Sequence, residues 1–161
     1  MILPGGVPDF IRANTETVIP PLLPEIRLYL ATELTPIWQA TESELQTQGL
    51  PPPFWAFCWP GGQAVARYIL DNPNLVRGRN VLDFASGCGV AAIAAAMAGA
   101  NSVVANDIDG FALRAAALNA ELNGVEIELC GDNILAGVRP DVVDRSDLIL
   151  AGDIFYDRPV A

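Results

Sequence analysis

The segment VLDFASGCGVAA, residues 81–92, constrains the fold of this 161-residue chain more strongly than any other. An apolar run is followed by closely spaced small residues and then by an alanine-rich stretch. This order predicts a buried strand, a tight turn and a helix whose N-terminus faces the turn. Backbone N–H groups at such a helix N-terminus can receive the polar groups of a ligand, so the segment predicts a cradle for a nucleotide.

Strands and helices alternate along the chain from residue 80 onward. Strands are predicted at 80–85, 102–107, 125–132 and 146–153, and helices at 91–100 and 110–124. This alternation predicts an α/β fold with a parallel sheet and right-handed crossovers. The third strand alternates apolar and acidic residues, as half-exposed edge strands do, whereas LILA in the fourth is continuously apolar, as in a strand covered on both faces. These patterns place the third strand at an edge and the fourth near the centre, which predicts the doubly wound strand order 3-2-1-4.

The first 53 residues are expected to form a helical N-terminal extension, followed by one domain over residues 54–161. Within the segment PLLPEIRLYLATEL, four apolar residues lie at roughly helical spacing: Leu22, Leu23, Ile26 and Leu30. After a proline-rich link, the segment GGQAVARYILDNP predicts a further helix that ends before its proline.

Composition and charge narrow the classes of partner. The net charge of −10 and the sequence pI near 4.2 argue against a nucleic-acid partner, because phosphate binding relies on clustered Lys and Arg. No apolar run reaches the roughly 18 residues of a membrane-spanning helix, so no membrane partner is expected. The N-terminus lacks the pattern of a signal or transit peptide, which predicts a cytoplasmic location.

Metal-binding and nucleophilic side chains are scarce. The chain has no histidine, and its three cysteines, Cys58, Cys88 and Cys130, form neither a metal-ligand pattern nor a disulfide pattern. A Ser-His-Asp triad is therefore impossible within this chain, and no metal site is expected. The scattered thiols fit a reducing compartment.

The glycine turn by itself fits two classes of ligand. GCGVAA satisfies the G-x-G-x-x-[GA] fingerprint of dinucleotide sites, and Asp107 at the end of the second strand can accept hydrogen bonds from ribose hydroxyls. Asp83, just before the turn, would repel a pyrophosphate and attract an ammonium group. S-adenosylmethionine carries a ribose, an ammonium and a sulfonium but no phosphate. The residues therefore favour S-adenosylmethionine, with a dinucleotide or a turn that binds no ligand as the alternatives.

The segments VLDFASGCGVAAIAAAMAGA, VVANDIDGFALRAAALNAELNG and GDIFYD resemble the seven-strand S-adenosylmethionine-dependent methyltransferases. Within this class the chain is most similar to the protein lysine methyltransferases of the electron-transfer flavoprotein β subunit and their bacterial relatives, which in turn are similar to ribosomal-protein methyltransferases. The resemblance covers residues 54–157 and is most specific in FWAFCWPGGQA and GDIFYD. It implies a Rossmann-like, doubly wound, mostly parallel sheet. Four strands are visible where the family has seven, so we expect the C-terminal strands to be missing and the fourth strand to need a cover.

The resemblance implies a set of residues around S-adenosylmethionine. By motif position these are Gly87 and Gly89 beside the methionine part, Asp83 near its ammonium, Asp107 on the ribose, Ile108 against the adenine and Asp132 on the adenine amino group. Trp59 and Gln63 would close over the cofactor, with core packing and a helix N-terminal polar role as their alternatives. Ala85 stands where the family more often has glycine, and its small methyl group is expected to be tolerated.

The segment after the fourth strand indicates the acceptor. Asp153 and Tyr156 form D-x-x-Y, which resembles the signature of seven-strand lysine methyltransferases and differs from the N/D-P-P-Y loop of enzymes that methylate nucleobase or glutamine nitrogens. The resemblance implies a protein lysine as acceptor, with the electron-transfer flavoprotein β subunit as the candidate protein. Asp153 would orient the amine, or else be a structural cap. The channel walls would be Phe54, Trp55, Phe155 and Tyr156.

Three other functions stay open at this point. The acceptor could be another protein amine or a small molecule. The glycine turn could serve a nicotinamide-dependent oxidoreductase instead. The chain could also be a binding module that keeps the cradle but performs no chemistry.

Overall fold

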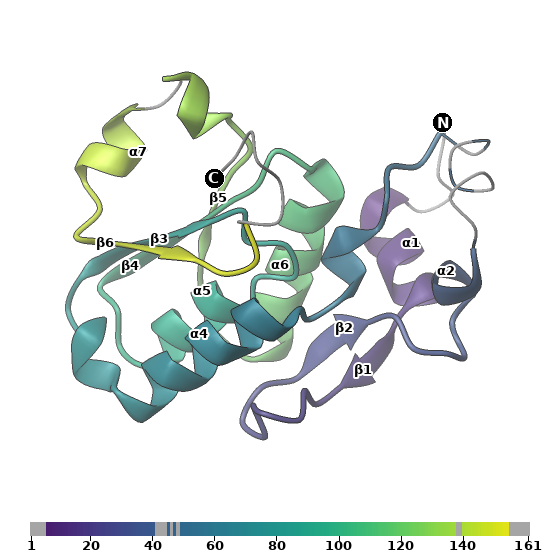
Figure 1. Cartoon of the computed structure of the whole chain (residues 1–161), viewed down its shortest axis with the longest axis horizontal. Coiled ribbons are helices and arrows are strands. Elements are labelled where there is room, and N and C mark those ends of the chain that lie inside the picture. Colours follow the sequence, from purple (N-terminus) through teal and green to yellow (C-terminus); the bar gives the residue numbers. More distant parts are fainter. Residues whose placement is uncertain (1–5, 41–44, 46, 48, 138–139, 155–161) are drawn as a thin grey trace.

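The computed structural model describes residues 6–40, 45, 47, 49–137 and 140–154 (Figure 1). Its centre is a four-stranded parallel sheet in the order β5-β4-β3-β6. The strands are β3 (Asn80–Phe84), β4 (Ser102–Asn106), β5 (Glu128–Cys130) and β6 (Leu148–Ala151). In order along the chain this is the arrangement 3-2-1-4, so the predicted doubly wound topology is confirmed.

Helices cover both faces of the sheet. Successive side chains of each strand point to opposite faces, so the strands contribute to two apolar clusters. On one face, Val81 and Val103 belong to an apolar cluster with residues of α4, α5 and α6. On the other face, Leu82 and Val104 pack with Val142 of α7. The helices are α4 (Pro60–Asp71), α5 (Val90–Met97), α6 (Gly110–Leu122) and α7 (Pro140–Asp144). Short 3-10 turns add η2 (Pro73–Leu75) and η3 (Ile134–Ala136).

Strand β6 is the edge strand beyond β3 among the described residues. Leu150 is buried, but Ile149 is 51% exposed, so the described part of the chain covers only one face of this strand. The described part of the chain thus does not supply a cover for both faces of LILA, which agrees with the expectation that the fourth strand needs a cover. The order of the strands is still as predicted, because the pairing of β6 with β3 is independent of what lies over Ile149.

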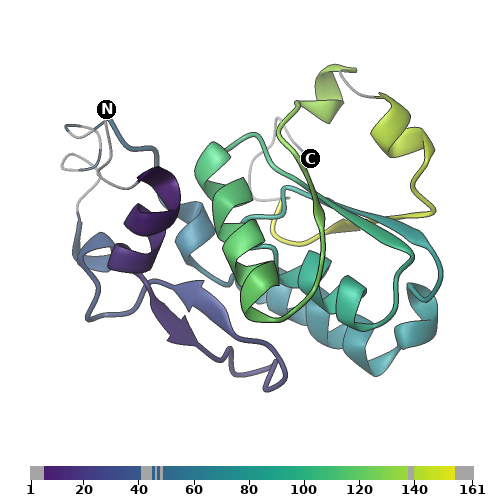
Figure 2. The same cartoon turned by 180° about the vertical axis from the view of Figure 1, so that it is seen from behind.

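The N-terminal region is only partly helical. It contains α1 (Gly6–Asn14), a hairpin of β1 (Glu16–Val18) and β2 (Leu28–Leu30), the short helix α2 (Pro36–Gln39) and the 3-10 turn η1 (Phe54–Ala56). Figure 2 shows α1 and the hairpin beside α6. The described helices include none that is long and apolar enough to cross a membrane.

The helix expected within PLLPEIRLYLATEL is wrong. Leu28 and Leu30 lie in β2 with the half-buried Tyr29 between them, which is the alternation of a strand. Three prolines, at 20, 21 and 24, remove backbone N–H donors and so disfavour a continuous helix. The buried side chains of Leu23 and Ile26 join the cluster beneath α4 and α5, so tertiary packing rather than helical periodicity places them.

Candidate active site

The turn between β3 and α5 has a backbone that side chains rarely allow. Ala85, Gly87 and Gly89 have φ angles of +53°, +54° and +79°. A Cβ on Gly89 would lie 2.8 Å from the Cβ of Ala116 in α6, so glycine is needed for the close approach of this helix. Ala85 is the one non-glycine residue with positive φ in the described chain, and its methyl group is accommodated at a strain of about 1 kcal/mol.

Asp107 holds this turn from the end of the neighbouring strand. Its Oδ2 accepts a hydrogen bond from the Gly87 N–H at 2.9 Å, and its Oδ1 accepts one from the Asp109 N–H at 2.9 Å. Each carboxylate oxygen keeps a second lone pair. The carboxylate is thus fixed at the mouth of the turn and can accept further hydrogen bonds from a pair of hydroxyl groups.

Asp83 lies beneath the turn and is 2% exposed. Its Oδ2 accepts a hydrogen bond from the Ala92 N–H at 2.9 Å, in the first turn of α5. Burial raises the pKa of Asp83 from 3.8 to about 7, and the nearby charge of Asp107 adds to the rise, whereas the Ala92 hydrogen bond opposes it. A cation placed next to this carboxyl group would stabilise its charged form.

The ends of β4 and β5 place the other two predicted cofactor residues. The Asn106 side chain donates to the carbonyl oxygens of Cys130, at 2.8 Å, and Asp132, at 2.9 Å, and so holds the loop after β5 against β4. Asp132 is half-buried, whereas the Ile108 side chain is 74% exposed. Because the exposed apolar side chain of Ile108 directly follows Asp107, it is suited to pack against the face of an adenine base.

Asp153 binds the first turn of α4. Its Oδ1 accepts a hydrogen bond from the Gly61 N–H at 3.0 Å, and its Oδ2 accepts one from the Gly62 N–H at 2.7 Å. A carboxylate at a helix N-terminus satisfies free N–H groups and interacts favourably with the helix dipole. The approach is close, because a Cβ on Gly61 would lie 2.7 Å from the Asp153 carboxylate and one on Gly152 would lie 3.1 Å from Gly62. The structural alternative for Asp153 is a cap of the fourth strand, whereas the carboxylate here caps helix α4.

The segment before α4 is held by its own side chains. The Trp59 indole N–H donates to the Phe54 carbonyl oxygen at 3.0 Å, and the Gln63 side chain donates to the Cys58 carbonyl oxygen at 2.8 Å. Phe54 and Trp59 are 54% and 44% exposed. The structure thus places both rings at the surface next to the N-terminus of α4.

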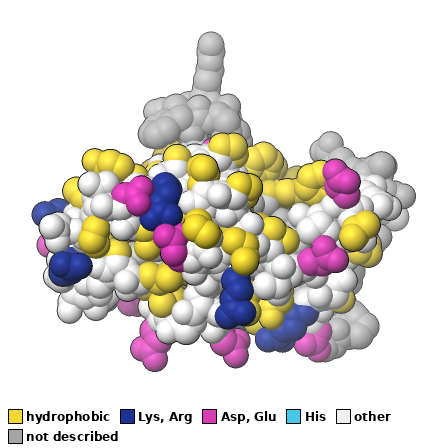
Figure 3. All heavy atoms as spheres, turned by 90° about the horizontal axis from the view of Figure 1, so that it is seen from below, with side chains coloured by type: hydrophobic (Ala, Val, Ile, Leu, Met, Phe, Trp, Pro, Cys, Tyr) yellow, Lys and Arg dark blue, Asp and Glu magenta, His cyan; other side chains and the backbone are white. Residues whose placement is uncertain are grey.

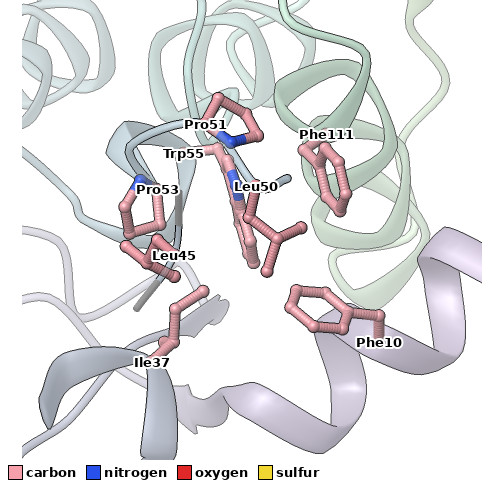
Figure 4. A pocket seen from close by; sticks show the side chains of 8 residues that line it. All are labelled: Phe10, Ile37, Leu45, Leu50, Pro51, Pro53, Trp55 and Phe111. Atoms are coloured by element: carbon pink, nitrogen blue, oxygen red, sulfur yellow. The ribbon is translucent and has the colours of Figure 1, made fainter. Parts of the chain in front are cut away.

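Trp55 lies elsewhere. It is 2% exposed and stacks on Phe111, with ring centroids 6.1 Å apart. Its ring borders a hollow whose lining is wholly apolar, formed by Phe10, Ile37, Leu45, Leu50, Pro51, Pro53, Trp55 and Phe111 (Figure 4). The prediction that Trp55 walls an acceptor channel is therefore wrong, because its ring fills the N-terminal core. Phe155 and Tyr156, the remaining predicted acceptor residues, lie outside the described residues.

Cys88 lies in the turn, and both Cys88 and Cys58 are free cysteines. A hydrogen bond with Cys88, together with burial, raises the pKa of the Cys58 thiol. Among the described residues no group of three or more His, Cys, Asp or Glu is suited to hold a metal ion. The groups gathered at this edge of the sheet are thus carboxylates, backbone amides and aromatic rings.

Sequence reasoning missed Asn119, which is fully buried. Its Nδ2 donates to the Cys88 carbonyl oxygen at 2.9 Å, and its Oδ1 accepts from the Tyr29 N–H at 2.7 Å. The residue therefore links the glycine turn to the N-terminal hairpin. The signal was a lone asparagine among the alanines and leucines of α6, since a buried amide needs hydrogen-bond partners.

The comparison with protein families decides the class. The sequence model of the ribosomal protein L11 methyltransferase (PrmA) family matches residues 67–152, which is more than half of the chain. The chain belongs to the PrmA methyltransferase family. The matched residues run from α4 to the segment after β6, so they include the glycine turn, Asp107 and the glycine before Asp153.

Two curated relatives of this PrmA-family chain share its N-terminal region as well. It is 46% identical over 154 residues to the electron transfer flavoprotein beta subunit lysine methyltransferase of Xenopus laevis, covering 95% of this chain and 60% of the relative. It is also 46% identical over 154 residues to the protein of that name from Homo sapiens, covering 94% of this chain and 56% of the relative. The chain therefore spans somewhat more than half of the length of these relatives.

Two solved structures of distant sequence share the fold of this chain. A putative methyltransferase complexed with SAH has a TM-score of 0.51 at 16% identity, over 77% of this chain and 28% of that one. The T. thermophilus 16S rRNA methyltransferase, solved with AdoMet and guanosine, has a TM-score of 0.50 at 23% identity, over 58% of this chain and 25% of that one. At these identities the likeness establishes the Rossmann-like fold alone.

Proposed function

We propose that the protein is an S-adenosylmethionine-dependent methyltransferase that transfers a methyl group to a lysine side chain of a protein, with the electron-transfer flavoprotein β subunit as acceptor. The observation that carries the proposal is the 46% identity along nearly the whole chain to lysine methyltransferases of that subunit. The cytoplasmic location and the domain boundary at residue 53 stay predictions.

The residues of the turn fit S-adenosylmethionine. The Ser86 hydroxyl is buried and lacks a hydrogen-bond partner within the described chain, as expected where a polar ligand group belongs. A Cβ on Gly87 would have no atom within 4 Å, so there is room above the turn. Asp83 and Asp107 supply negative charge, and no Lys or Arg occurs from residue 80 to residue 113. This charge suits an ammonium group and disfavours the pyrophosphate of a nicotinamide cofactor.

The proposed chemistry is the in-line attack of a neutral amine on a sulfonium-bound methyl group, which the cofactor supplies. Gly87 and Gly89 would bind the methionine part, with Asp83 beside its ammonium. Asp107 would hold the ribose, and Ile108 would cover the adenine. Asp132 would accept a hydrogen bond from the adenine amino group. The protein's main task is then alignment of nucleophile, methyl and leaving group. The lysine must lose its proton, and contact with exposed rings such as Phe54 would favour the neutral amine by desolvation.

Asp153 is the proposed orienting group for the amine. Both of its oxygens accept N–H bonds from α4, and each keeps a lone pair for an amine N–H. The same carboxylate follows β6, binds the start of α4 and would also contact the acceptor. Trp59 and Gln63 would hold the segment that closes over the cofactor.

Replacement of Asp107 by alanine is expected to weaken S-adenosylhomocysteine binding by about 2–3 kcal/mol, or roughly 30- to 150-fold, since charge-assisted hydrogen bonds to the ribose are lost. Isothermal titration calorimetry measures the change. The matched control is Asp109→Ala in the same loop, which removes the cap of α6 but no ribose contact. An Asp107→Ala protein that is folded and binds with unchanged affinity would exclude the ribose role.

Replacement of Asp153 by asparagine is expected to slow methyl transfer roughly a hundredfold, equivalent to about 3 kcal/mol in the barrier. It should also lower stability by about 1–2 kcal/mol, because the asparagine NH₂ faces a glycine N–H in place of an acceptor. Asp147→Asn is the control, since Asp147 accepts a hydrogen bond from the Asn80 N–H at the opposite end of the sheet. Single-turnover methylation and thermal unfolding are measured on one preparation. A normal rate in a less stable Asp153→Asn protein would leave Asp153 as a cap alone.

Binding measurements also separate the remaining alternatives. A nicotinamide-dependent oxidoreductase would bind NAD, whereas the proposed enzyme binds S-adenosylhomocysteine and not NAD. If the acceptor amine belongs to another protein or to a small molecule, cofactor binding would be unchanged. A labelled methyl group from S-adenosylmethionine would then appear on that molecule and not on the β subunit. These 161 residues contain no lysine, because all nine of their basic residues are arginine, so methyl-lysine cannot arise on this part of the protein.

A further inference from the structure

Four aromatic rings form a continuous row at the surface before α4. We call Trp38, Phe57, Trp59 and Phe54 the aromatic row. Ring centroids are 5.5 Å apart between Trp38 and Phe57, 5.6 Å between Phe57 and Trp59, and 6.3 Å between Trp59 and Phe54. Trp38 is 48% exposed, so large aromatic surface lies open at both the α2 side and the α4 side of the row.

The row begins at the proposed reacting edge. Trp59 directly precedes the first turn of α4, and its carbonyl oxygen accepts the Gln63 N–H at 3.0 Å. The next two residues with free N–H groups, Gly61 and Gly62, bind the carboxylate of Asp153. From there the row extends to Trp38 of α2, and Leu34, two residues before this helix, is 83% exposed. The open rings are thus continuous with the place where an acceptor amine would enter.

The charge along this segment has one sign. No Lys or Arg occurs from residue 28 to residue 66. Glu33, five residues before Trp38, is exposed, and so is Asp153, which accepts hydrogen bonds from the Gly61 and Gly62 N–H groups just after Trp59. The face shown in Figure 3 mixes acidic and basic side chains. On α4, Arg67 pairs with Glu25 and Asp71. The absence of basic residues from this segment and the net charge of −10 favour a cationic partner over nucleic acid.

We propose that the aromatic row docks the basic segment of the protein acceptor that carries the target lysine. The inference rests on the proposed function. Lysine and arginine side chains lay their apolar stems on aromatic rings and gain cation–π attraction from the ring faces. Neighbouring basic residues of the acceptor would lie on Trp38 and Phe57, while the target amine reaches Asp153 past Trp59. A second copy of this chain is a poor occupant, because each copy carries a net charge of −10.

The test uses the complete protein encoded by the gene and the recombinant human electron-transfer flavoprotein β subunit as acceptor. Trp38→Ala is expected to raise the KM for this acceptor about tenfold and to leave S-adenosylhomocysteine affinity within twofold of wild type. Trp38→Phe should restore most of the loss. Tyr68→Ala is the matched control, because Tyr68 is a 62% exposed aromatic residue on α4 outside the row, and it should leave KM unchanged.

The outcomes separate this inference from the proposed function. If the wild type methylates the β subunit and Trp38→Ala has the wild-type KM, docking on the row is excluded while the proposed function stands. If the wild type binds S-adenosylhomocysteine but methylates no lysine, the proposed function fails, and calorimetric binding of the β subunit to wild type and Trp38→Ala decides the row alone. Equal binding by both proteins would overturn the inference. Dissociation of a homodimer by Trp38→Ala, seen by light scattering, would also overturn it, because the occupant would then be a second copy.

Discussion

An Asp83→Asn protein is expected to be more stable than the wild type at pH 8, by up to about 4 kcal/mol, and to lose this advantage on acidification. The folded state raises the pKa of Asp83 from 3.8 to about 7 through burial. Between these values the folded protein keeps a proton that the unfolded chain releases, so wild-type stability falls as pH rises from about 4 through 7. Above pH 7 the full cost of a buried charge is present, because each tenfold change in acidity between the two states corresponds to about 1.4 kcal/mol.

Asparagine avoids this cost and can still accept the hydrogen bond from the Ala92 N–H. Urea unfolding of both proteins at pH 4.5 and pH 8 gives the difference between variant and wild type at each pH. Asp144→Asn, at an exposed aspartate of α7, controls for the loss of one negative charge. A constant difference between wild type and Asp83→Asn across this range would show that Asp83 does not titrate near neutrality. If Asp83 receives the cofactor's ammonium, the more stable variant should also bind S-adenosylhomocysteine more weakly.

A Gly89→Ala protein is expected to lose roughly 2–5 kcal/mol of folding free energy. Positive φ costs an alanine about 1–2 kcal/mol, and overpacking of a close contact costs about 1–3 kcal/mol more. The new methyl carbon would lie 2.8 Å from the Ala116 Cβ and 3.0 Å from the Ala116 Cα, so α6 itself would have to move. Chemical unfolding measures the loss.

Gly124→Ala separates the two contributions. Gly124 also has a positive φ, of +67°, but a Cβ there would have no atom within 4 Å. It should therefore show the backbone strain alone, about 1–2 kcal/mol. Equal losses for the two variants would mean that the contact between Gly89 and Ala116 does not limit the packing of α6 against the turn.

The sheet could be predicted because its signals are local. An apolar strand followed by small residues and an alanine-rich helix specifies β3, its turn and α5 within one segment, and the alternation of elements then implies parallel pairing. The hairpin of β1 and β2 could not be predicted in this way. Leu23 and Leu30 fit a helical period by spacing, but contacts with residues far along the chain decide their conformation.

In the candidate site too, some residues could be placed from local sequence and others only from contacts between distant parts of the chain. Asp107 is placed by the end of its strand, and its position follows from the sequence order. Asp153 is placed by two backbone N–H groups 92 and 91 residues earlier, which no local pattern reveals. Trp55 and Trp59 lie four residues apart with the same side chain, yet one fills a core and the other is 44% exposed. The aromatic side chains made both tryptophans candidate site residues. Only the packing of the N-terminal region shows that Trp55 belongs to a core and Trp59 to the surface.

The proposed function is the transfer of a methyl group from S-adenosylmethionine to a lysine of a protein. The most direct measurement incubates the complete protein with methyl-labelled S-adenosylmethionine and the electron-transfer flavoprotein β subunit, and locates the label by mass spectrometry. We expect labelled methyl-lysine in the β subunit, with the signal strongly reduced for Asp107→Ala. Label on arginine, glutamine or nucleic acid, or no label from an enzyme that binds S-adenosylhomocysteine, would contradict it.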